Sequence, residues 1–446
     1  MNRGWLVALF FALILAGCSY ETLDYSEVLN KELEQRLESV AGSVEHFKLP
    51  DHDDYASIPQ DPRNPLTEAK VTLGKFLFFE TGIGIDASQQ SGMETYSCAT
   101  CHDPKAAFKP AAQQGVADGG FGYGQRGEMR TKNPAYGNFE VDAQAIRPLS
   151  VLNVAFVENT FWNGRFGGSG INEGTEASWT EADGTHLNEM GLEGIETQNI
   201  EGLHVHRMRM TEDLADQLGY KDLYDEAFPE FDESERYSVM TTSFAISAYI
   251  RSLITDKAPF QQWLRGNKLA LTDGEIKGAL LFFGKARCFT CHQGPGLSAV
   301  EFHALGVKDL HQAHPNPLAT SADDIRNLGR AGFTGKEEDM FAFKVPQLYN
   351  MKDNPFYFHG GSKTSLEEVV DYKSKAESEN PNVDNSQLSP KFQPLDLSDK
   401  EKKHLLEFLK HGLYDEDLDR YVPKFIMSGN CFPNNDVRSK QELGCN

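Results

Sequence analysis

Four of the seven cysteines fall into two copies of one pattern, in which a Cys-x-x-Cys pair is followed at once by a histidine. The copies are Cys98-Ala-Thr-Cys101-His102 and Cys288-Phe-Thr-Cys291-His292. The two thiols of such a pattern can add to the vinyl groups of a haem, and the histidine then becomes an axial ligand of the iron. A zinc site or a redox-active dithiol would also use a Cys-x-x-Cys pair, but neither requires the histidine. The motifs therefore predict two covalently bound c-type haems, with His102 and His292 as axial ligands.

The other three cysteines lie near the two ends of the chain. Residues 1–18 contain Arg3, then an apolar run, then Leu-Ala-Gly before Cys18. This order is typical of a secretory signal, and its ending is similar to the lipobox at which Cys18 is acylated. The alternative is an ordinary signal from which Cys18 is lost. We expect a periplasmic protein, lipid-anchored to a bacterial membrane, in which Cys431 and Cys445 form a structural disulfide.

The composition is that of a globular protein that carries a strong negative charge. Hydrophobic residues make up 39% of the 446 residues and the mean hydropathy is -0.48, which excludes a membrane bundle. The formal net charge of -23 at pH 7 argues against nucleic acid as a partner. An electron-donating partner should carry a basic face, although the acidity can also serve solubility alone.

The elements that must position the two motifs repeat one plan. Leu73-Gly-Lys-Phe-Leu-Phe-Phe79 precedes the first motif. A capping box at Thr272 and Glu275 begins a helix over 276–283, with the sequence Leu-Leu-Phe-Phe, before the second motif. This repetition favours duplicated haem domains.

The remaining patterns are also helical. Apolar residues recur at helical spacing over 238–255, and a capping box at Ser398 and Glu401 begins another helix. Since no stretch alternates as a strand would, we expect a mainly α fold: two c-type cytochrome domains with long loops, in which the haems supply much of each core. The expected divisions are a signal peptide (1–17), a polar tether (18–60), an N-terminal haem domain (61–270), a C-terminal haem domain (271–425) and a disulfide-closed tail (426–446).

Six segments resemble the bacterial di-haem cytochrome c peroxidases, a family that includes the di-haem enzyme which matures methylamine dehydrogenase. They are residues 73–79, 97–103, Phe161-Trp-Asn-Gly-Arg165, Phe343-Lys-Val-Pro346, Phe356-Tyr-Phe-His-Gly-Gly361 and Leu366-Glu-Glu-Val-Val370. The resemblance implies that the N-terminal haem reacts with peroxide and that the C-terminal haem receives electrons. It also places Trp162 between the haems, and Arg165 and His359 in their surroundings. An ordinary core role for Trp162 is the alternative.

On the peroxide side the sequence departs from the family. No histidine occurs between His102 and His186, so the distal histidine of the type members has no counterpart, and we expect an open iron or ligation by Tyr123 of the loop 119–124. Arg147 stands where the family has a calcium-binding asparagine, which leaves calcium uncertain.

The family's peroxide-cleaving glutamate also lacks a clean match. His206 falls at its position, and imidazole can move a proton between the peroxide oxygens as a carboxylate can. Arg207 or Arg209 could stabilise the leaving hydroxide. Glu196 and Glu189 are the other candidates, and a surface histidine without a role is an equal alternative to a catalytic His206.

The sixth ligand of the second haem is a methionine or tyrosine in the family, fourteen residues after the histidine that corresponds to His359. That count gives Lys373, beside Tyr372. Leu366, Val369, Val370 and Lys373 share one helix face, which turns the lysine inward. We expect Tyr372 to be the ligand after a small rotation, with Lys373 or an open site as alternatives.

The expected function is reduction of hydrogen peroxide to water, with electrons from a small periplasmic cytochrome c or cupredoxin. The first alternative is an oxidase of a protein or small-molecule substrate, and the second is a plain electron carrier. An open axial position with a polar distal group would favour an enzyme, because carriers usually fill both axial positions. Contact with the membrane is expected only through the lipid at Cys18.

Overall fold

The computed structural model describes residues 25–445, so the predicted signal peptide and Cys18 lie outside the described part. The first half is built on α2 (Glu68–Phe79), which begins at the N-cap Thr67 and packs against α7 (Val239–Arg251). The two helices approach so closely that a Cβ atom on Gly74 would lie 1.8 Å from the carbonyl oxygen of Ala245. Only glycine permits this contact.

The second half repeats that arrangement. Helix α9 (Asp273–Phe282) begins at the predicted capping box of Thr272 and packs against α13 (Asp399–Glu407). A Cβ atom on Gly278 would lie 2.0 Å from the carbonyl oxygen of His404. Each Cys-x-x-Cys-His motif is therefore preceded by a helix whose glycine lies against the backbone of a second helix.

The fold is mainly helical, as predicted, with many short 3-10 turns. No helix within the described residues is long and apolar enough to cross a membrane. The other helices are α1 (Tyr25–Ala41), α3 (Gly194–Val205), α4 (Glu212–Leu218), α5 (Lys221–Ala227), α6 (Glu233–Arg236), α8 (Pro259–Leu264), α10 (Leu310–Ala313), α11 (Ala331–Thr334), α12 (Leu366–Lys375) and α14 (Val437–Leu443).

Two small antiparallel sheets correct the expectation that strands are absent. One pairs β1 (Gly120–Phe121) with β2 (Thr131–Lys132), and the other pairs β3 (Ala299–Ala304) with β4 (Ala342–Val345). Strand β4 is mostly buried, so its sequence does not alternate, and its partner lies about forty residues earlier. The second sheet matters for the site because it carries residues on the cavity wall.

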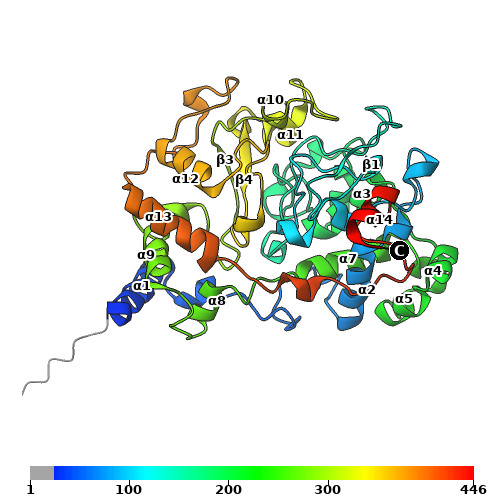
Figure 1. Cartoon of the computed structure of the whole chain (residues 1–446), viewed down its shortest axis with the longest axis horizontal. Helices are drawn as coiled ribbons and strands as arrows, with labels where there is room; N and C mark the ends of the chain where they lie inside the picture. Colours follow the sequence, from blue (N-terminus) through cyan, green and yellow to red (C-terminus); the bar gives the residue numbers. More distant parts are fainter. Residues whose placement is uncertain (1–24, 446) are drawn as a thin grey trace, which may run out of the picture.

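The N-terminal segment corrects the predicted polar tether. From Tyr25 onward it is folded, with α1 packed against α9 (Figure 1) and with Leu29, Leu33 and Leu37 buried in the core of the second half. A stripe of one leucine per helical turn is narrow, and the polar residues around it concealed its apolar face. The folded chain therefore begins well before residue 61.

The C-terminal segment runs from the second half of the fold back to the first half. Leu418, Tyr421 and Ile426 belong to the core of the first half, so the predicted end of the second domain at residue 425 is too late. Beyond them Cys431 and Cys445 form the predicted disulfide. Figure 1 shows α14 and the C-terminus at the opposite end of the molecule from α1.

The C-terminal tail also holds the first motif directly. Ser97 donates a hydrogen bond to the carbonyl oxygen of Pro433 (2.9 Å), and Thr100, inside the motif, donates to the side-chain oxygen of Asn434 (2.6 Å). The tail is thus a structural part of the first motif's surroundings.

Candidate functional site

The two motifs face a shared interior space. A cavity of about 320 Å³ is lined by both motif histidines and by Cys288 and Cys291. A smaller cavity of about 120 Å³ also borders His102 and is lined by Cys98 and Cys101. The fold therefore places all six motif residues on cavity walls.

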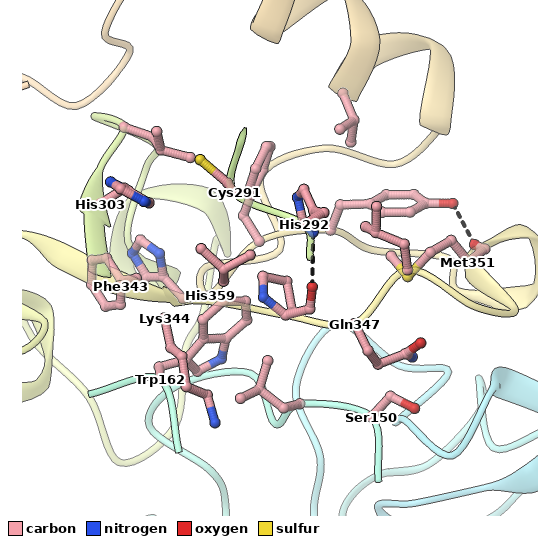
Figure 2. A pocket seen from close by; sticks show the side chains of 18 of the residues that line it. Ser150, Trp162, Cys291, His292, His303, Phe343, Lys344, Gln347, Met351 and His359 are labelled. Atoms are coloured by element: carbon pink, nitrogen blue, oxygen red, sulfur yellow. Dashed lines mark hydrogen bonds between the residues drawn. The ribbon is translucent and has the colours of Figure 1, made fainter. Parts of the chain in front are cut away.

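Both histidines are oriented with one ring nitrogen free. Nδ1 of His102 donates to the carbonyl oxygen of Phe108 (3.0 Å), and Nδ1 of His292 lies 3.0 Å from the carbonyl oxygen of Leu297 and 3.1 Å from that of Pro346 (Figure 2). Burial lowers the pKa of each imidazole to about 4, so both are neutral at pH 7. A neutral ring whose Nδ1–H is held by a carbonyl offers Nε2 to a metal.

The helices before the motifs support these rings in matching ways. The ring of Phe78 lies 6.4 Å from that of His102, and the ring of Phe282 lies 6.4 Å from that of His292. The phenylalanine residues that precede each motif thus pack against the histidine of that motif.

The four motif cysteines are free thiols. Burial raises the pKa of Cys98, Cys101 and Cys288 to about 12, so these sulfurs are protonated. Within residues 25–445, no three side chains of histidine, cysteine, aspartate or glutamate converge as a metal site would require. Free, protonated thiols beside a histidine suit addition to haem vinyl groups.

Cations without carboxylate partners also line the cavities. Lys109 is 5% exposed and its side-chain amine forms no hydrogen bond or ion pair with the described chain, and Nε of Arg165 is buried without a partner. Nζ of Lys344 donates only to the carbonyl oxygen of Asn159 (2.9 Å), and burial lowers the pKa of this amine to about 7. Buried cations need counter-charges, and each haem would bring two propionates. The residues present therefore fit two haems.

His206, predicted to act on peroxide, faces both cavities together with His102. Its Nδ1 lies 2.7 Å from a carboxylate oxygen of Asp142. Burial lowers the pKa of His206, but the charge and hydrogen bond of Asp142 outweigh this effect and raise it above its ordinary value. A ring held in this way keeps Nε2 for a ligand in the cavity.

Gln144 and Gln198 line both cavities beside His206. The side-chain oxygen of Gln144 is buried without a hydrogen-bond partner. No sequence motif marks either glutamine or Asp142, so none of the three was predicted. Asp142 and Gln144 lie two positions apart in the sequence, and this spacing was the one available sign that they could share a site.

The other predicted distal groups point elsewhere. Glu196 is fully buried in an ion pair with Arg251 (2.6 Å) and does not line the cavities, and Glu189 is exposed. Arg207 binds Asp118, and Arg209 binds Asp86 at the surface (2.9 Å). Glu196, Arg207 and Arg209 are thus held by nearer partners of opposite charge, and the exposed Glu189 lies away from the cavities, so the structure contradicts the predicted distal roles.

Tyr123 is likewise not a distal ligand. Its hydroxyl donates to the carboxylate of Asp103 (2.7 Å), the residue after His102, and it does not line the cavities.

Trp162 forms part of the wall of the larger cavity, close to the second half (Figure 2). Its Nε1 donates to the carbonyl oxygen of Arg147 (2.6 Å), and its ring lies 6.2 Å from that of His359. His359 is buried, stacks on Phe343 at 3.6 Å and has Nε2 2.9 Å from a carboxylate oxygen of Asp309. This packing fixes the indole between the regions of the two motifs.

Arg147 lies behind the indole and is fully buried. Its guanidinium donates to the carbonyl oxygens of Ala112 (2.6 Å), Gln113 (3.0 Å) and Pro110, and to the side-chain oxygen of Asn354 (3.1 Å). Backbone and amide oxygens of this kind are also calcium ligands. In this protein these oxygens surround the guanidinium of Arg147, a cation that belongs to the chain itself.

The two candidates for the sixth ligand are separated by the fold. Tyr372 is buried, donates to the carbonyl oxygen of Leu305 (2.5 Å) and does not line the cavity. Lys373 does line it. The hydroxyl of Tyr372 is thus engaged away from the cavity, which speaks against the predicted preference for Tyr372.

Two haem-attachment turns on one interior space define a di-haem c-type cytochrome. Residues 68–269 match the family model described as di-haem cytochrome c peroxidase. This match places residues 68–269 in the family, and a relative named as a cytochrome-c peroxidase is an oxidoreductase.

Its relatives cover most of the chain. It is 26% identical over 407 residues to the methylamine utilization protein MauG of Methylorubrum extorquens, covering 91% of this chain and 94% of the relative. It is 26% identical over 397 residues to the cytochrome-c peroxidase IdrP1 of Denitromonas iodatirespirans, covering 84% and 90%. The crystal structure of a MauG-like protein associated with microbial copper homeostasis has a TM-score of 0.55 and 24% identity, covering 83% of this chain and 95% of that chain. This last likeness supports the fold.

Proposed function

We propose that the chain is a di-haem peroxidase that reduces hydrogen peroxide to water with electrons from a small periplasmic redox protein. One haem is attached at Cys98 and Cys101, and the other at Cys288 and Cys291, and they complete the two cores. The observation that carries the proposal is the pair His206 and Asp142, which faces the same cavity as His102. A relative named as a cytochrome-c peroxidase supports it.

The chemistry divides between the cofactor and the chain. When bound, the haem supplies a redox-active iron that can pass two electrons to peroxide, which with two protons becomes two waters. His206 Nε2 takes the proton from the inner peroxide oxygen and returns it to the outer oxygen, so that the leaving group departs as water. Asp142 keeps the ring oriented and stabilises it while it is protonated. Gln144 and Gln198 orient peroxide from the same wall.

Electrons would enter at the second half and cross to the first through the region of Trp162. Its Nε1–H is held by a backbone carbonyl, so the ring is fixed. The acidic chain favours a donor with a basic face, a small cytochrome c or cupredoxin. We further propose a periplasmic location and a lipid anchor at Cys18, on the sequence pattern of residues 1–18.

The second candidate is oxidation of a protein or small-molecule substrate, with both haems storing oxidising equivalents. The high mutual coverage with the methylamine utilization protein MauG favours keeping this candidate.

A single experiment separates the two. The purified holoprotein is mixed with peroxide, first alone and then with a reduced small cytochrome c. A peroxidase oxidises two donor molecules for each peroxide, over many turnovers. If the protein reacts with peroxide once but does not turn over with any small basic donor, the second candidate is favoured. If no reaction with peroxide occurs, both fail.

A further inference from the structure

The cavity wall around His292 offers few side chains that could bind a second axial position. Lys373, His303 and Met351 all line this cavity. His303 is already engaged, since its Nδ1 lies 2.9 Å from the hydroxyl of Ser389 and its Nε2 lies 3.2 Å from the carboxylate of Glu301. Figure 2 shows His303 and Met351 on different sides of His292. Of these three, Lys373 and Met351 have a donor atom that no described residue binds.

Lys373 is presented to the cavity by the geometry of α12. Leu366, Val369 and Val370 lie on the same face of this helix, and all three line the cavity as Lys373 does. Tyr372, one position earlier, is turned about 100° away around the helix. Its hydroxyl bond to Leu305 keeps it there.

The amine of Lys373 has no polar partner in the described chain. Its Nζ lies over the ring of Phe392, 5.4 Å from the ring centroid. Other lysines of this half are paired: Lys363 with Glu379, and Lys391 with Glu301 at 2.7 Å. Burial lowers the pKa of Lys373, although the nearby thiols of Cys291 and Cys288 oppose this effect. An unpaired amine in such a place is held most easily as the neutral base, whose lone pair needs an acceptor.

We infer that Lys373 is the second axial ligand of the haem attached at Cys288 and Cys291, opposite His292. The inference rests on the proposed haem attachment at these cysteines and not on the proposed reaction with peroxide. A haem with nitrogen ligands on both faces has no site for peroxide, so it would only transfer electrons. The two haems would then differ in function because one axial position is filled and the other faces His206.

The test uses the holoprotein with both haems, verified by the mass of the denatured chain. Three variants are compared with the wild type: Lys373→Leu, Lys373→Arg and the control Tyr372→Phe. Arginine keeps the positive charge but stays protonated, so it cannot ligate the iron. The readouts are electron paramagnetic resonance of the ferric protein, the two reduction potentials, and binding of added imidazole.

The wild type should show one low-spin ferric haem that does not bind imidazole. In Lys373→Leu and in Lys373→Arg that haem should become high-spin and bind imidazole, and its potential should rise because the amine lone pair favours the ferric state. Tyr372→Phe should leave the spectrum and both potentials unchanged.

Two results would overturn the inference. If Lys373→Arg keeps the wild-type spectrum and potential, the lysine acts only as a charge, for example toward a propionate. If Met351→Leu produces the high-spin haem and Lys373→Leu does not, the thioether of Met351 is the ligand.

Should Lys373→Leu fail to fold, Lys373→Met carries the test, because methionine is also an unbranched side chain and ligates haem iron. It should then give a low-spin haem with the near-infrared band of sulfur ligation, and the unchanged wild-type spectrum would count against lysine. A chain that carries two haems but no peroxide activity would refute the reaction and leave this ligand assignment standing.

Discussion

The pair His206 and Asp142 allows the sharpest test of the proposed chemistry. A positioned acid–base group contributes roughly 100-fold or more to a rate, which is about 2.7 kcal/mol of transition-state free energy. His206→Ala should therefore slow the reaction of the diferric protein with peroxide by about 100-fold or more. His204→Ala is the matched control, because His204 lies two residues away with 82% of its side chain exposed.

Asp142→Asn should have a smaller effect on the same rate. The 2.7 Å contact with a carboxylate is a charge-assisted hydrogen bond, worth about 1.5–3 kcal/mol, against about 0.5–1.5 kcal/mol for a neutral one. The difference of about 1–1.5 kcal/mol predicts roughly a five- to tenfold loss.

The rate of reaction with peroxide should also depend on pH, in a direction set by the protonation of His206. His206 must be neutral to accept a proton, so the rate should rise as the pH passes through its pKa. Asp142 raises the pKa of His206, so in Asp142→Asn the inflection should move to lower pH. Stopped-flow mixing with peroxide, without a donor, measures both the rate and the profile. A wild-type rate in His206→Ala, or an inflection that moves upward in Asp142→Asn, would refute the assignment.

Three further predictions follow from the structure. The ferric N-terminal haem should be high-spin and react with peroxide without a lag, because Tyr123 is bound elsewhere; a low-spin signal, or a lag removed by pre-reduction, would contradict this. Calcium chelators should leave the spectrum and activity unchanged. Arg147→Met should lower the free energy of unfolding by about 3 kcal/mol or more in denaturant titrations, because several buried oxygens lose their donor. An effect of chelation alone would show that a metal is needed. Gly278→Ala should destabilise the fold by about 1–3 kcal/mol in the same titration through its clash with His404, while Gly202→Ala, with nothing within 4 Å, should not; equal effects would refute the packing argument.

The features that sequence predicted well are those encoded locally. The attachment motifs, the capping boxes of α9 and α13 and the aromatic ridges each depend on residues a few positions apart. The helical spacing of Leu366, Val370 and Lys373 correctly predicted that Lys373 faces inward. The preference for Tyr372 followed the usual chemistry of haem ligands and not this geometry, and the structure turns its hydroxyl away from the cavity.

The features that sequence missed depend on distant contacts. The charge partner of His206 lies sixty-four residues earlier, and the partner of Glu196 is Arg251. Nothing near Glu196 in the sequence shows that an arginine on another helix neutralises it. The packing of α1 on α9 is similar, since it joins residues more than two hundred positions apart.

The crossed ends of the chain also set an order for its maturation. The second half receives α1, which precedes both motifs in the chain, and its other supporting helices are complete once residues through Leu413 have been synthesised. The first half must wait, because the turn that contains Thr100 is held by Asn434, and its core includes Tyr421. During synthesis, the motif that is made first therefore acquires its final support last. A chain that ended after Leu413 would contain every residue of both motifs, yet only the later one would have its main supporting helices.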